Sequence, residues 1–263
     1  MRKRILSALV LAPAALAAAY LGAPYWDQVI VVLGLLMGWE WARLCGGGTL
    51  SPAGVGLIAG VLTVLLVAEL WGFKPALLAL VLAGPAVAGI AAPQFRGRAA
   101  WFAAGMLYVG LSCLALIWIR ADVEHGLVIL LWVLALVWAT DTAAYFTGKA
   151  IGGPKLAPRI SPNKTWAGLA GGMLAATGVG VAFAIATPIL SPWFFVMISG
   201  SLAVVEQIGD LFESAVKRRF GVKDSGALIP GHGGVLDRVD GLIAVAMAVA
   251  VLTLASGRSP LLW

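Results

Sequence analysis

The chain consists of long apolar runs separated by short polar segments. Nine such runs fall at roughly 5–22, 27–44, 53–71, 75–92, 99–119, 126–147, 166–187, 192–212 and 240–256. Each is close to the ~20 residues that cross a bilayer as a helix. Strands of membrane barrels alternate polar and apolar residues, and these runs do not. The pattern predicts an all-α, polytopic integral membrane protein with about nine transmembrane helices.

The composition agrees with this class, because 61% of the residues are hydrophobic and only 11% are charged, whereas soluble domains are about 45–50% apolar. No repeat and no soluble domain is visible. We therefore treat 1–263 as a single membrane-embedded domain, with N-terminal helices in 1–125 and catalytic helices and loops in 126–263. The first run resembles a signal peptide in its basic start and alanine-rich end. Eight further runs favour an uncleaved span instead.

Basic residues set the orientation, since cytoplasmic loops carry an excess of lysine and arginine. With the N-terminus in the cytoplasm, all but three of the 18 basic residues lie on the cytoplasmic side; the exceptions are Lys74, Arg120 and Arg258. Topology and anionic lipid or phosphate substrates account for the net charge of +6, so no nucleic-acid partner is expected. Cys45 and Cys113 have no motif partners, and we expect neither a disulfide nor a metal there.

Charged residues concentrate in Ser214–Asp240, which holds eight of the 30 in the chain together with His232 and many glycines. If the eighth run continues as a helix to Phe220, one face carries a polar stripe, and Gly221 then ends that helix. The stripe comprises Glu206, Asp210, Ser214 and Lys217. A chain that keeps polar groups scarce and gathers both signs of charge here is predicted to place its chemistry here.

Acidic residues inside apolar spans are costly and indicate function. Four of them fall toward the cytoplasmic ends of their predicted helices, and Glu69 lies near an outer end, where an interfacial position suffices; the four are Glu40, Asp141, Glu206 and Asp210. A transporter would carry ionisable groups near the midplane. The distribution therefore predicts a reaction site at the cytoplasmic helix ends.

Three aspartates are candidate ligands for a hard cation. Asp237 and Asp240 share a face if the ninth helix starts there, and Asp210 lies on the preceding helix. Mg²⁺ takes one or two carboxylates together with phosphates and water. The alternative is that each aspartate pairs with an arginine or caps a helix. For any single aspartate, pairing or capping is the simpler explanation. The three aspartates taken together favour a metal site.

A second basic loop runs from Lys149 to Trp166. Ser161 and Pro162 form a good N-cap and first-turn pair, so we expect a helix to begin there and to offer its N–H groups, with Lys164, to a phosphate. The excess of basic residues in cytoplasmic loops, together with helix capping, would also explain the composition of this loop. His232, between glycines, is open to three interpretations: a base, a phosphate donor or a turn residue.

These motifs carry a family resemblance. Ser214-Ala-Val-Lys-Arg, Lys223-Asp224, Pro230-Gly-His-Gly-Gly234 and Asp237-Arg-Val-Asp240 resemble the signature of the phosphatidate cytidylyltransferase (CDP-diacylglycerol synthase) family. Asp141 to Lys149, Gly209-Asp210 and Ser161-Pro-Asn-Lys-Thr-Trp166 agree as well. The resemblance covers about 141–245, whereas the N-terminal spans agree only in being hydrophobic. Ala167 stands where the family usually has Glu, so no essential acid is expected at that position.

The resemblance implies a Mg²⁺-dependent membrane enzyme, with a second cation left open, that joins CTP to phosphatidic acid. Its products would be CDP-diacylglycerol and pyrophosphate, for phospholipid biosynthesis. The partners expected are CTP, phosphatidic acid and membrane lipids, and a homodimer is left open. The expected location is the bacterial inner membrane, with the N-terminus and the active site cytoplasmic.

The site residues follow from the same motifs. We expect Asp210, Asp237, Lys217 and Arg238 to be catalytic and Asp210, Asp237 and Asp240 to bind metal. Substrate-binding candidates are Asp141, Ser161, Asn163, Lys164, Thr165, Ser214, Arg218, Lys223, Asp224, His232, Gly233 and Gly234.

Two other classes of membrane protein fit the sequence less well. A CDP-alcohol phosphotransferase needs Asp-Gly-x-x-Ala-Arg, but Asp240-Gly241 is the only Asp-Gly pair and no Ala-Arg follows it. A transporter or scaffold would be supported by paired half-repeats and by acids near the midplane, and the sequence has neither.

Overall fold

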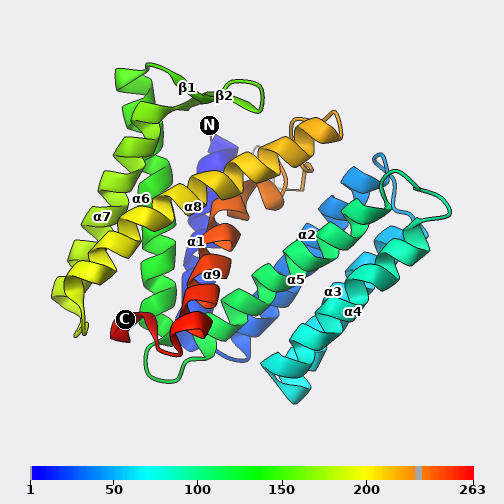
Figure 1. Ribbon diagram of the computed structural model, residues 1–263, viewed down its shortest axis with the longest axis horizontal. Coiled ribbons are helices and arrows are strands. Elements are labelled where there is room, and N and C mark those ends of the chain that lie inside the picture. The colour runs from blue at the N-terminus through cyan, green and yellow to red at the C-terminus, as the bar shows by residue number, and fades with distance from the viewer. Residues whose placement is uncertain (1, 229–232) are drawn as a thin grey trace. The chain divides into compact units, whose positions relative to one another are not determined.

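The computed structural model describes residues 2–228 and 233–263 and is built almost entirely of helices (Figure 1). Within these ranges there are nine α-helices, and they coincide with the nine predicted spans. Eight of them, from α2 onward, are long and apolar enough to cross a membrane, and the stretch Ala12–Leu21 of α1 is a shorter apolar helix. The all-α, polytopic membrane fold is confirmed.

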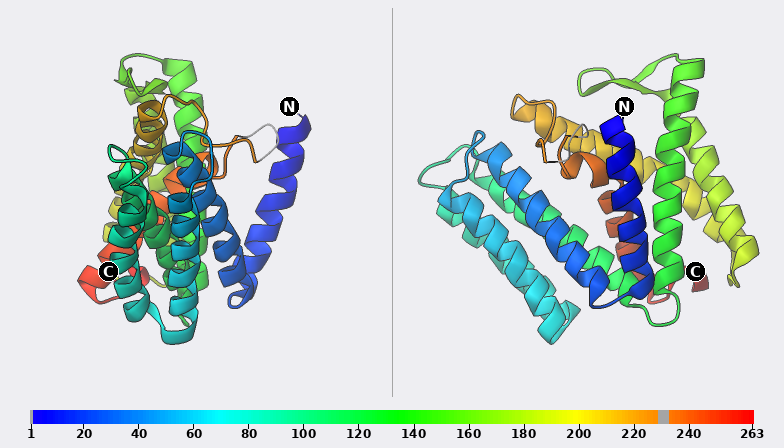
Figure 2. Two further views of the ribbon diagram at one scale, coloured as in Figure 1. Left: turned by 90° about the vertical axis from the view of Figure 1, so that its right-hand side faces the viewer. Right: turned by 180° about the vertical axis from the view of Figure 1, so that it is seen from behind.

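The chain forms two compact units, which are described one at a time. Unit 1 contains residues 1–121 and 219–238. Its helices are α1 (Arg2–Leu21), α2 (Tyr25–Cys45), α3 (Pro52–Trp71), α4 (Phe73–Ala91) and α5 (Ala99–Ala121). Helices α2 to α5 pack side by side, α3 against α4 and α4 against α5 (Figures 1 and 2). The indole N–H groups of Trp26 and Trp41 donate to carbonyl oxygens of α5, at Leu116 and Trp101, which ties α2 to α5.

Unit 2 contains residues 122–218 and 239–263. It is built from α6 (Gly126–Ile151), strands β1 (Lys155–Ala157) and β2 (Ser161–Thr165), α7 (Trp166–Ala186), α8 (Pro192–Arg219), most of α9 (Leu236–Ser256) and a short 3₁₀ turn (Pro260–Leu262). Helices α6 and α7 run side by side (Figure 2). Glycines allow this approach: a Cβ on Gly171 would collide with the Thr147 side chain, and one on Gly168 would lie 2.8 Å from the Ala144 carbonyl oxygen.

The start of α7 differs from the sequence prediction. Ser161 and Pro162 do not cap a helix; they lie in β2, which pairs antiparallel with β1. The N-cap is Thr165, whose hydroxyl accepts a hydrogen bond from the Gly168 N–H at 3.0 Å. Serine and threonine are both favourable caps, and the pairing of β2 with β1 decides between them. The prediction that Ser161 begins a helix was therefore wrong.

The end of α8 follows the prediction closely. The helix continues to Arg219, and Gly221 two residues later has a φ of 74°, a conformation that suits glycine and ends a helix. The ninth helix begins at Leu236, so Asp237 and Asp240 are both helical and three residues apart.

Candidate functional site

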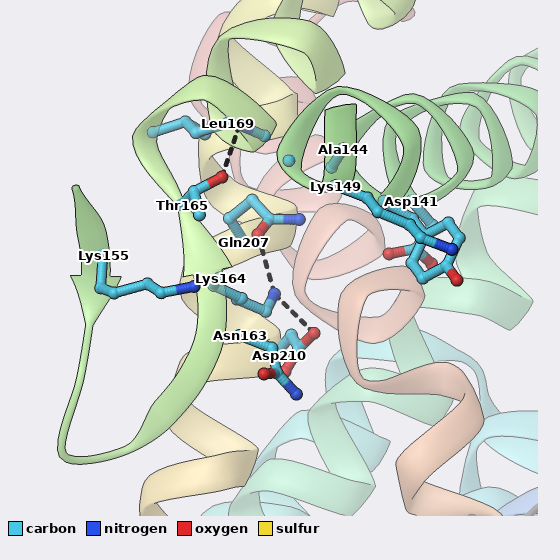
Figure 3. A pocket seen from close by; sticks show the side chains of 13 residues that line it. Asp141, Ala144, Lys149, Lys155, Asn163, Lys164, Thr165, Leu169, Gln207 and Asp210 are labelled. Carbon is cyan, nitrogen blue, oxygen red and sulfur yellow. Dashed lines mark hydrogen bonds and ion pairs between the residues drawn. The ribbon is translucent and has the colours of Figure 1, made fainter. Parts of the chain in front are cut away.

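A pocket of about 470 Å³ opens in unit 2 at the end of the helix bundle that carries the β-hairpin (Figure 3). Its walls come from the end of α6, both strands, the start of α7 and the middle of α8. The polar lining combines three lysines with carboxylates, amides and hydroxyls: Lys149, Lys155, Lys164, Asp141, Asp210, Asn163, Gln207, Thr165 and Tyr145. Its volume is in the range of small-ligand sites, and its lining suits an anionic ligand.

A hydrogen-bonded chain of polar side chains runs from the lining of the pocket along α8. Lys164 reaches from β2 to α8, where its Nζ lies 2.5 Å from Asp210 Oδ2 and 2.8 Å from Gln207 Oε1 (Figure 3). Gln207 Nε2 in turn donates to Glu206 Oε2 at 2.6 Å, and Ser214 Oγ lies 3.3 Å from Asp210 Oδ1. The predicted polar stripe on α8 is thus present, and its Asp210 pairs with Lys164 of the second basic loop.

Carboxyl groups of three helices gather beside this chain. Asp141 of α6 is in hydrogen-bonding contact with Glu206 of α8, and Asp240 of α9 is an electrostatic neighbour of Asp210 and Asp141. Two carboxyl groups in such contact need a proton or a cation between them, because two bare carboxylates repel. The cluster therefore has the donor chemistry of a hard-cation site.

The donor set is incomplete for a metal held by protein alone. Among the described residues, no group of three or more His, Cys, Asp or Glu side chains is placed so that it could hold a metal ion. Mg²⁺ does not need one, because it retains waters and binds through one or two carboxylates plus substrate phosphates. Asp210 and Asp240 fit that mode.

Lys217 has a different environment from the one expected of a substrate ligand. It is buried and forms an ion pair with Glu213, one turn earlier on α8, whose side chain is 2% exposed. Glu213 was missed in the sequence, although its i, i+4 spacing from Lys217 is the signal of such a pair. Neither residue lines the pocket, and neither do Ser161, Ser214 and Arg218.

The remaining predicted residues that the structure describes lie in unit 1, on the segment that leads into α9 and in the first turn of that helix. Asp237 Oδ2 accepts hydrogen bonds from Ser225 N at 3.0 Å, Ser225 Oγ at 2.9 Å and Gly234 N at 2.8 Å. Lys223, Asp224 and Arg238 are exposed, and Gly233 adopts a φ of 86° beside Asp237. His232 lies outside the described residues.

The structure therefore brings five of the predicted residues into one pocket: Asp141, Asn163, Lys164, Thr165 and Asp210. Sequence reasoning did not select Gln207, Lys149 or Lys155. Both lysines belong to the basic loop of the sequence prediction, and Lys149 also ends a stretch that agrees with the family. Gln207 could have been predicted from the sequence, since it is three residues before Asp210 and lies on the same helix face.

The chain is similar in sequence to known proteins along nearly its whole length. Proteins named phosphatidate cytidylyltransferase from Brucella suis and Brucella melitensis are 41% and 42% identical to this chain, over 94% of its length and 90% of theirs. One of the same name from Pseudomonas aeruginosa is 37% identical over 98% of both chains. The model of the cytidylyltransferase family matches residues 2–255. The match extends through the N-terminal helices as well as the signature segment, and the chain belongs to the cytidylyltransferase family.

Proposed function

We propose that this protein transfers the cytidylyl group of CTP to phosphatidic acid, giving CDP-diacylglycerol and pyrophosphate. A phosphatidate oxygen attacks the α-phosphorus of CTP, a new P–O bond forms, and the bond to the pyrophosphate group breaks. The observation that carries the proposal is the pocket centred on Lys164 and Asp210, built from the family motifs in a chain that matches relatives of that name over nearly their whole length.

The pocket residues suit this reaction. The attacking phosphate is already ionised at neutral pH, so the site needs positioning and charge neutralisation more than a strong base. Lys149, Lys155 and Lys164 supply positive charge for the phosphates of CTP, and Asn163 and Thr165 supply uncharged polar groups. Helices end at this pocket, which suits a lipid substrate that approaches from the membrane.

We propose Mg²⁺ as the cofactor, held by Asp210 and Asp240 with substrate phosphates completing its shell. The carboxyl cluster supports this, since a cation offsets the repulsion among its members. When bound, the ion would neutralise charge on the pyrophosphate leaving group. The part of Asp237 in metal binding, a second cation and a homodimer stay predictions.

We also propose that the protein lies in the bacterial inner membrane with its N-terminus and pocket on the cytoplasmic side, as the distribution of basic residues favours. Single cysteines at two exposed positions test this. Arg159→Cys should react with an impermeant maleimide only after the membrane is opened, and Lys74→Cys should react in intact cells. The native Cys45 and Cys113 are buried, so their background labelling should be low. The reverse pattern would overturn the orientation.

The reaction is tested with protein purified in detergent and supplied with CTP, phosphatidic acid and Mg²⁺. Pyrophosphate and CDP-diacylglycerol should appear in equal amounts. Diacylglycerol in place of phosphatidic acid is the matched control, because it lacks the attacking phosphate. Absence of product across varied lipid, detergent and metal conditions would refute the proposed function.

A further inference from the structure

Glu40 of α2 is a fully buried acid in unit 1, with no exposed surface, and lies far in sequence from every predicted site residue. Its Oε1 accepts a hydrogen bond from Val235 N at 2.8 Å, and its Oε2 accepts one from Leu236 N at 2.8 Å. Ser225 Oγ lies 3.1 Å from the same Oε2. A buried carboxylate is costly unless it is hydrogen-bonded, and this one receives all of its described bonds from the signature segment.

The two backbone bonds fall at the start of α9. The first N–H groups of a helix have no intrahelical acceptor, and the helix dipole favours negative charge at that end. Local side chains usually satisfy such groups. Here a carboxylate of another helix does so with both oxygens, which fixes the start of α9 against α2.

The glycines of the signature make room for this carboxylate. A Cβ on Gly226 or on Gly234 would lie 2.7 Å from Glu40 Oε1, closer than real Cβ atoms approach, and one on Gly234 would also collide with Ser225 Oγ. Glycine at positions 226 and 234 is thus explained by the space that the Glu40 carboxylate occupies.

Ser225 connects Glu40 to Asp237. Its hydroxyl carries one proton and lies between two carboxylates, 3.1 Å from Glu40 Oε2 and 2.9 Å from Asp237 Oδ2. The N–H groups of Ser225 and Gly234 bind the same Asp237 oxygen. A shift of Glu40 would therefore move the donors that orient Asp237.

We infer that Glu40 is a positioning residue: it anchors Ser225 and residues 234–236 and thereby sets the orientation of Asp237 and Arg238. Glu40 acts through Ser225 and the backbone of the segment. The inference rests on the proposed function for its catalytic consequence, but the anchoring itself can be measured without activity.

The decisive variant is Glu40→Gln, which keeps the side-chain volume but replaces one acceptor oxygen with an NH₂ group that cannot accept from the α9 backbone. We expect kcat to fall by about 10–100-fold, the effect of misplacing a reacting group by about 1 Å, while KM for CTP changes less than about threefold. Hydrogen exchange of the amides of Gly234, Val235 and Leu236 should become at least about tenfold faster.

Ser112→Ala is the matched control. It removes a buried polar group of the same unit, on α5, that donates to the Tyr108 carbonyl oxygen of its own helix. It should leave kcat and the exchange of the α9 amides unchanged even if it lowers the unfolding temperature. If Glu40→Gln does not fold, Ser225→Ala, which removes only the bridging hydroxyl, should show the same loss of kcat to a smaller extent.

The outcomes separate the two proposals. Folded Glu40→Gln, or Ser225→Ala in its place, with wild-type kcat would show that Glu40 has a structural role only and would overturn the inference. A wild-type protein that makes no product would refute the proposed function instead. In that case hydrogen exchange still tests the anchoring. Unchanged exchange of the Val235 and Leu236 amides in Glu40→Gln would overturn it.

Discussion

Replacing Lys164 with methionine should lower turnover and should also lower the Mg²⁺ concentration needed for half-maximal activity. In the structure the Lys164 ammonium holds Asp210, with Gln207 as its second partner. We expect this lysine to exchange Asp210 for a substrate phosphate during the reaction. The substitution keeps an unbranched side chain that is one atom shorter but removes the charge, so both Asp210 and the phosphate lose a cation.

The magnitudes follow from the contacts. A hydrogen bond to a charged group contributes about 1.5–3 kcal/mol, and the low end applies because the Lys164 and Asp210 side chains are 17% and 26% exposed and partly screened. A Mg²⁺ ion that binds Asp210 no longer has to displace the lysine. The half-saturating Mg²⁺ concentration should therefore fall about tenfold, since about 1.4 kcal/mol corresponds to a factor of ten. Loss of a charged donor from the reacting phosphates should lower kcat by about 10²–10³-fold.

Pyrophosphate release measured against Mg²⁺ concentration, at saturating CTP, gives both quantities in one experiment. Lys155→Met is the matched control, since Lys155 lines the same pocket but is exposed and forms no ion pair within the described part of the chain. It should cost only a few-fold in kcat/KM and leave the Mg²⁺ dependence unchanged. Wild-type kcat in Lys164→Met, or a higher Mg²⁺ requirement, would refute the roles given to this lysine.

Three further predictions concern the metal, the signature aspartate and the helix packing. EDTA should abolish pyrophosphate release and added Mg²⁺ should restore it; release that is insensitive to the chelator would contradict the cofactor proposal. Asp237→Asn should lower turnover by more than about 10³-fold while membrane insertion, followed by fractionation, stays normal; near-normal activity would remove Asp237 from the metal site. Gly168→Ala places a Cβ 2.8 Å from the Ala144 carbonyl oxygen, so it should cost about 1–3 kcal/mol and lower the unfolding midpoint by several degrees, and an unchanged midpoint would show that α6 and α7 can separate freely.

The helices were predictable because an apolar run of sufficient length is a property of the sequence alone. Their ends were less so: α6 continues to Ile151, beyond the apolar part of its run, and α9 begins at Leu236, before the apolar part of its run. Hydropathy reports which residues suit lipid, whereas a helix continues as long as its backbone bonds do. The hairpin was missed for a related reason, because the local cap signal of Ser161 is overruled by the pairing of its strand with Ala157.

The site was predictable where its partners share a helix. Asp210, Ser214 and Glu206 fall on one face at i, i+4 spacing. The structure joins Glu206 to Asp210 through Gln207 and Lys164, and Ser214 bonds to Asp210 directly. Contacts across the chain were not predictable: Glu40 and Val235 are 195 positions apart, and no periodicity connects them. Glu40 was recognisable only as an acid in an apolar span, which indicates function without giving a partner.

The signature segment depends on more of the chain than its own charges suggest. Residues 219–238 belong to the unit built on α1 to α5, and the residues on both sides of them belong to the other unit. The family match includes the N-terminal helices, and within them α2 supplies the carboxylate that contacts the signature glycines and the start of α9. A membrane anchor would need only apolar side chains and would not retain a buried acid, because an acid without partners destabilises a span. We therefore interpret α2 as part of the catalytic architecture, and loss of activity in folded Glu40→Gln is the result that this interpretation requires.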